Sequence, residues 1–250
     1  MWIDVFSGVT IPFLGTAAGA LCVFLLKKHM SGKTECILSG FAGGVMVAAS
    51  FFSLILPAIE GVGKMGRLAF IPASAGFMLG VLFLIFIDKI MPYIGFEKIE
   101  KEKNLKLVLA VTVHNLPEGM AVGIAYAGVL YGKGSITAMS ALALAVGIAL
   151  QNFPEGAIVS MPLHACGISK PKSFVCGALS GIVEPLGAIA TIFAAGFFVP
   201  LMPYFLSFAA GAMFYVVIEE LLPQKEKMSV GTLFFALGFI MMMALDVGLK

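Results

Sequence analysis

The sequence predicts an all-α, polytopic membrane protein in which residues 1–250 form one integral membrane domain with eight transmembrane helices. Of the 250 residues, 60% are hydrophobic and only 12% are charged, and the mean hydropathy is +1.04. Soluble domains carry about 25% charged residues, so a lipid environment is expected. A helix needs about 20 apolar residues to cross ~30 Å of hydrocarbon, and the chain contains a series of runs of that length.

Eight apolar runs meet this requirement. They cover residues 5–26, 37–59, 68–91, 105–129, 137–162, 173–198, 203–222 and 230–249. Charged or proline-containing segments separate the runs, and only Pro200 and Pro203 mark the boundary before the seventh. No cleavable signal peptide is expected, because the first run lacks a basic leader and a small-residue cleavage site.

The basic residues predict how the chain lies in the membrane, since Lys and Arg are concentrated in cytoplasmic loops. Twelve lysines fall on one side of the runs: Lys27, Lys28, Lys33, Lys89, Lys98, Lys101, Lys103, Lys106, Lys170, Lys172, Lys225 and Lys227. The other side receives Lys64, Arg67, Lys133 and Lys250. The first side is therefore predicted to be cytoplasmic, with both termini outside a bacterial inner (plasma) membrane. The net charge of +2 is too small to indicate a nucleic-acid partner.

A repeated polar motif lies inside the fourth and fifth runs. Residues 114–119 read HNLPEG, and residues 151–156 read QNFPEG. A charged side chain at the centre of a bilayer costs roughly 2.5–3.5 kcal/mol, so ionisable residues in spans are usually functional. Helix residues four apart share a face. His114 and Glu118 should therefore project together from one helix, and Gln151 and Glu155 from the next.

The two motif helices run in opposite directions. Each helix rises about 1.5 Å per residue, so the depth of a residue follows from its distance in sequence from the cytoplasmic edge. By this count His114 lies at the same depth as Glu155, and Glu118 at the same depth as Gln151. The neighbouring asparagines, one residue further along each helix, can serve a second ion.

The prolines of the motifs add acceptors. Pro117 and Pro154 are expected to kink their helices and to leave the carbonyls of Val113 and Leu150 free.

A third acid, Glu184, repeats the carboxylate-beside-proline pattern in the sixth run. Three carboxylates with one imidazole need cations, and such a site suits Zn²⁺, Fe²⁺, Mn²⁺ or Cd²⁺ better than Cu(I). The predicted metal ligands are His114, Asn115, Glu118, Gln151, Asn152, Glu155 and Glu184. The metal is expected as cargo, and no prosthetic group is expected. The alternatives are hydrogen-bonded helix contacts or a proton relay.

The two motifs resemble those of the ZIP (Zrt/Irt-like) family of divalent metal transporters. HNLPEG matches the family's HNxPEG pattern at every fixed position, and QNFPEG resembles the GufA-like branch. The resemblance covers the whole chain. It implies a ZIP-like helix bundle with outward termini and one or two metal ions between the fourth, fifth and sixth spans. It also implies a homodimer and an elevator-like movement of a transport bundle against a scaffold.

Further polar residues mark a possible path for the ion. Met46, Ser53 and Glu60 are spaced by seven along the second run, and Asp246 falls near the outer end of the eighth. Glu220 falls near the inner end of the seventh. Each of these can also be an ordinary solvated residue at a span end.

The predicted function is uptake of a divalent transition metal, zinc foremost, into the cytoplasm by alternating access. An inside-negative potential of 100 mV favours entry of a dication by about 4.6 kcal/mol, so no ATP is needed. The alternatives are a proton-coupled carrier of another solute and an intramembrane metal-dependent hydrolase. The hydrolase is disfavoured because the sequence has no HExxH motif, and the protein is therefore not expected to be an enzyme.

Overall fold

A computed structural model describes residues 2–25, 31–90, 103–132, 136–165, 167–198, 201–221 and 228–248. Every regular element in these ranges is a helix, which confirms the all-α prediction. The elements are α1 (Trp2–Ala20), α2 (Cys22–Leu25), α3 (Gly32–Ala49), η1 (Ser50–Ile55), α4 (Leu56–Gly61), η2 (Gly63–Leu68), α5 (Phe70–Ile90), α6 (Lys103–Tyr131), α7 (Ala138–Ala165), α8 (Lys170–Ser180), α9 (Val183–Phe198), α10 (Met202–Val216), η7 (Val217–Leu221) and α11 (Met228–Gly248).

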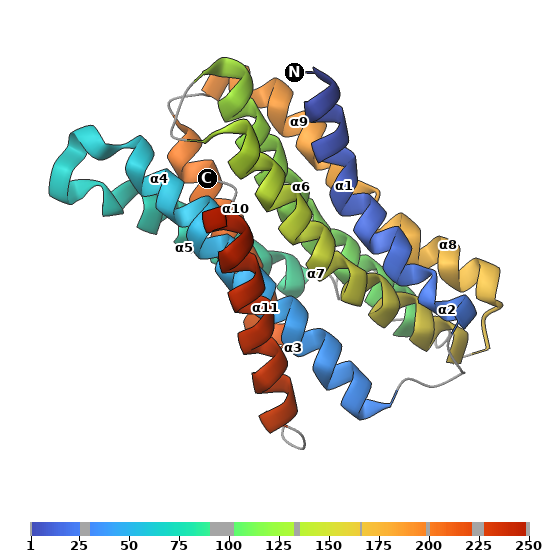
Figure 1. The fold of residues 1–250 in the computed structure, drawn as a ribbon. Helices are drawn as coiled ribbons and strands as arrows, with labels where there is room; N and C mark the ends of the chain where they lie inside the picture. The colour runs from blue at the N-terminus through green and yellow to red at the C-terminus, as the bar shows by residue number, and fades with distance from the viewer. Residues whose placement is uncertain are drawn as a thin grey trace.

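Each predicted run corresponds to one helix or to consecutive helical segments. Among the described residues, seven helical stretches are long and apolar enough to cross a membrane, so the chain is a polytopic membrane protein. The helix of the fourth run, α6, has 29 residues but is not one of the seven. The count of eight crossings therefore stays a prediction, as does the orientation. The start of α1 and the end of α11 lie toward the same end of the bundle (Figure 1).

The helices pack in four close pairs, α1 with α7, α6 with α9, α3 with α11, and α5 with α10. Glycines form these contacts. A Cβ at Gly156 on α7 would overlap the Thr16 carbonyl on α1, and a Cβ at Gly44 on α3 would overlap the Phe235 carbonyl on α11. Lipid gives helices no hydrophobic reason to associate, so close backbone approach supplies the attraction through dispersion.

These pairs form two groups of helices, visible in Figure 1. One group contains α1, α6, α7, α8 and α9, and the other contains α3, α5, α10 and α11. The groups meet chiefly where α3 packs on α7 and α10 packs on α6. The largest hydrophobic cluster lies across this boundary, with Met46 and Met213 from one group and Tyr126 and Leu144 from the other.

The sixth run is interrupted, although the sequence predicts one continuous span. The chain turns at Gly181 and Ile182, and α9 begins anew at Val183. Pro185 has no N–H and would clash within a helix, but it is tolerated in a first turn. Glu184 consequently lies in the first turn of α9, where the helix dipole favours a negative side chain. Pro117 and Pro154, in contrast, lie inside α6 and α7 without ending them.

Candidate metal-binding site

The two motif helices meet through a hydrogen bond between their polar side chains. Gln151 Nε2 on α7 donates to Glu118 Oε1 on α6 at 2.7 Å. Both side chains are almost completely buried, with 0% and 1% exposure. Glu118 and Gln151, which were predicted to lie at the same depth, are therefore in direct contact.

The two motif asparagines point their amide nitrogens at backbone carbonyls. Asn115 Nδ2 donates to the carbonyl of Ser180 on α8 at 3.1 Å, and Asn152 Nδ2 faces the carbonyl of Pro12 on α1 at 3.4 Å. A carbonyl can only accept, so the nitrogen of each amide must be the atom facing it. The side-chain oxygens of both residues are consequently turned away from these contacts.

The third acid is held by a residue of α1. Glu184 Oε1 accepts a hydrogen bond of 2.8 Å from the Thr16 hydroxyl, and both side chains are fully buried. Glu184 also lies close enough to Glu118 and to Glu155 for its charge to interact with both. Glu184 is therefore a neighbour of both the acid of α6 and the acid of α7.

The most informative feature of this site is a set of buried oxygens without donors. Five side-chain oxygens have no hydrogen-bond partner within the described part of the chain: Asn115 Oδ1, Glu118 Oε2, Gln151 Oε1, Asn152 Oδ1 and Glu184 Oε2. An unsatisfied buried polar group costs about 1–3 kcal/mol, more when it is charged. All five are oxygen acceptors, and carboxylate and amide oxygens are common ligands of divalent cations in proteins.

The acids are neighbours, but in the described part of the chain they do not form a complete metal-coordination site by themselves. The described residues include no group of three or more His, Cys, Asp or Glu side chains placed to hold a metal. The backbone of His114 lies in α6, but its side chain is outside the described residues, so its predicted pairing with Glu155 stays a prediction. Glu155 is buried on α7 with 8% exposure. Among the described residues, the amide oxygens of Asn115, Gln151 and Asn152 are further oxygen acceptors beside these acids.

The structure brings together two of the predicted path residues. Ser53 in η1 donates a hydrogen bond of 2.7 Å to Asp246 Oδ1 in α11, and both residues are buried. Met46 is also buried, whereas Glu60 at the end of α4 is exposed. Glu220 lies in η7, and its side chain is outside the described residues.

Sequence reasoning missed the contribution of α1. Thr16 and the Pro12 carbonyl both reach the site, and Gly15 and Gly19 beside them bring α1 close to α7. The sequence did contain one signal for this contribution. Thr16 places a hydroxyl inside an apolar run, between two glycines that allow another helix to approach.

Taken together, the fold and the site define a class of protein. A multi-pass helix bundle that encloses acids and amide oxygens, with a break in the helix before Glu184, has the interrupted helices and buried polar groups typical of membrane transporters. The chain therefore has the architecture of a membrane transporter, with buried acids and acceptor oxygens in its interior.

Comparison with known proteins gives the family. A family model described as ZIP zinc transporter matches residues 101–246. The zinc transporter ZIP11 of Xenopus tropicalis is 34% identical over 99% of this chain and 99% of its own. The zinc transporter GufA of Myxococcus xanthus is 34% identical over 94% of each chain. The zinc transporter ZIPB of Bordetella bronchiseptica is 34% identical over 97% of this chain and 80% of its own.

The chain belongs to the ZIP family of zinc transporters and is GufA-like within it, as the two motifs predicted. This is a family of transporters of divalent metal ions and not of enzymes, so metal ions are the cargo.

Proposed function

We propose that this protein carries a divalent transition-metal ion into the cytoplasm by alternating access, through the site between α6, α7 and α9. Zinc is the first candidate, because the similar proteins are named as zinc transporters. Iron, manganese and cadmium are the further candidates, since oxygen and nitrogen ligands suit them too.

The observation that carries this proposal is the set of five buried oxygens without donors. Glu118, Glu155 and Glu184 supply the negative charge that a dication needs. Asn115, Gln151 and Asn152 supply neutral oxygens, and His114 supplies a nitrogen from the same helix face as Glu118. The set is large enough for one ion or for two neighbouring ions.

The route to this site uses the other group of helices. Exposed Glu60 attracts the ion, and the Ser53–Asp246 pair and Met46 lead it inward. Glu220 in η7 lies on the way to the cytoplasm. With the basic residues inside and both termini outside, the membrane potential drives the dication inward. The working form is a homodimer in a bacterial inner membrane.

The test is zinc uptake by purified protein reconstituted in vesicles. Glu118→Ala should abolish uptake, because it removes one charge and one unsatisfied oxygen from the centre. Asp88→Asn is the matched control, since this acid lies on α5 of the other group and accepts a hydrogen bond from Tyr215 at 2.6 Å. Undiminished uptake by folded Glu118→Ala would remove the site assignment. A wild-type protein that is neither stabilised by zinc nor able to move it would favour a carrier of another solute.

A further inference from the structure

Thr16 on α1 makes a contact that neither the motifs nor the metal-ligand set account for. Its hydroxyl donates to Glu184 Oε1 at 2.8 Å, across 168 positions of sequence, and both side chains are 0% exposed. Oε2 of the same carboxylate has no hydrogen-bond partner among the described residues. The hydroxyl therefore satisfies one oxygen of Glu184, while Oε2 lies buried without a hydrogen-bond donor.

The surrounding backbone is shaped around this pair. A Cβ at Gly181 would lie 2.8 Å from both Glu184 Oε1 and the Thr16 hydroxyl, so the absence of a side chain there makes room for the contact. The Thr16 carbonyl lies against Gly156 on α7, where a Cβ would overlap it. Thr16 is thereby fixed against α7, one residue from Glu155, while it holds Glu184 of α9.

The terminal torsion of a glutamate is broad, so the plane of its carboxylate is fixed only by what it contacts. Metal coordination depends on the direction in which the free carboxylate oxygen points. Residues that hydrogen-bond to a ligand, without binding the metal themselves, set that direction. We infer that Thr16 is a positioning residue of the metal site, which turns Glu184 Oε2 toward a divalent cation shared with Glu118 and Glu155. This inference rests on the function proposed above.

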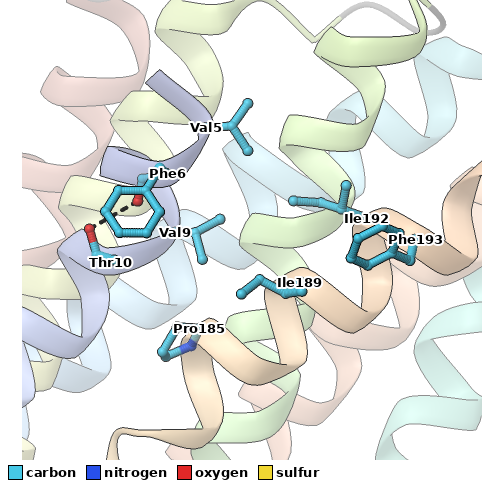
Figure 2. Close-up of a pocket in the computed structure, with 8 residues that line it drawn as sticks. All are labelled: Val5, Phe6, Val9, Thr10, Pro185, Ile189, Ile192 and Phe193. Carbon is cyan, nitrogen blue, oxygen red and sulfur yellow. Dashed lines mark hydrogen bonds between the residues drawn. The ribbon is translucent and has the colours of Figure 1, made fainter. Parts of the chain in front are cut away.

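Another threonine of α1 provides a matched control. Thr10 lies in an apolar pocket on a different part of the α1–α9 contact, beside Pro185, and Figure 2 shows its hydroxyl bonded to the Phe6 carbonyl. The Thr10 hydroxyl donates at 2.9 Å to Phe6 and at 3.0 Å to Ser7, both within its own helix. Thr10→Val makes the same chemical change as Thr16→Val without touching a carboxylate.

The experiment measures zinc uptake against zinc concentration for vesicles containing wild type, Thr16→Val, Thr16→Ser or Thr10→Val. Thr16→Val should raise the apparent KM at least about tenfold, since a hydrogen bond to a charged group is lost. The maximal rate should change much less. Thr16→Ser, which keeps the hydroxyl, and Thr10→Val should stay within about twofold of wild type, by the usual spread of neutral substitutions. The zinc-induced rise in unfolding temperature should shrink in Thr16→Val alone.

A wild-type KM for Thr16→Val, or a Thr16→Ser as impaired as Thr16→Val, would overturn the inference. If Thr16→Val does not fold, Thr16→Ala against Thr16→Ser makes the same comparison. A wild type that takes up no zinc overturns the proposed function itself. The inference on Thr16 fails alone when wild type transports zinc and removal of the hydroxyl changes nothing.

Discussion

At the scale of single residues, each of two buried acids has one oxygen bonded to a neutral donor and one oxygen left over. Gln151 donates a hydrogen bond to Glu118 Oε1, and Thr16 donates one to Glu184 Oε1. A lysine or arginine in either place would cancel the charge that attracts a cation. An amide or a hydroxyl satisfies one acceptor without cancelling the charge, so the site remains negative and ready for a dication.

Removing the neutral donor of Glu118 should destabilise the protein. Gln151→Leu has a similar volume but leaves both Glu118 oxygens without a donor, which should cost about 1–3 kcal/mol of unfolding free energy. Thermal unfolding in detergent without metal measures this effect. The double variant Glu118→Leu/Gln151→Leu should be less destabilised than the sum of the single variants, because residue 118 is then no longer an acid that needs the donor of Gln151. Additive effects would show that the contact carries no coupling.

At the scale of helices, glycine decides which pairs pack closely. Gly43 and Gly44 are neighbours on α3 but face different surroundings. A Cβ at Gly44 would overlap the Phe235 backbone of α11, whereas a Cβ at Gly43 would meet the Phe235 ring at 3.4 Å and the Leu221 Cβ at 3.6 Å. Backbone cannot move aside as easily as a side chain can.

These neighbours give a matched pair of substitutions. Gly44→Ala should destabilise the protein by about 1–3 kcal/mol, because it forces α3 and α11 apart. Gly43→Ala should be neutral or slightly stabilising, since alanine favours a helix over glycine by about 1 kcal/mol. Unfolding temperatures in one detergent compare the two variants. Equal effects of the two alanines would mean that close packing at Gly44 does not hold α3 to α11.

Helix positions could largely be predicted from the sequence, because runs of apolar residues and their breakers are explicit in it. The break before Glu184 could not, since hydropathy averages over it and Pro185 was interpreted only as a neighbour of the acid. The π-helical segments η1 and η7 were also not predicted. A π-helical turn contains one residue more than an α-helical turn, and the amino-acid composition does not reveal it. The π-helical segment η1 nevertheless contains Ser53, which donates a hydrogen bond to Asp246.

At the scale of the whole molecule, the candidate site and the predicted entrance belong to different groups of helices. The acids lie on α6, α7 and α9, whereas the Ser53–Asp246 pair joins η1 and α11. The sequence could predict that Glu118 and Gln151 lie at the same depth, because that depth follows from the known rise of two antiparallel helices. The partner of each glycine-rich face could not be predicted, since small residues indicate close contact without naming the helix that makes it.

The central claim is that a dication binds between α6, α7 and α9. Anomalous X-ray scattering at the zinc edge, from crystals grown with zinc, tests it most directly. We expect a zinc peak about 2.0–2.2 Å from carboxylate oxygens of Glu118, Glu155 or Glu184, the usual distance for this bond, and its loss in Glu118→Ala. Zinc found only elsewhere, at Ser53 and Asp246 or on the surface, with an unchanged pattern in Glu118→Ala, would contradict the account.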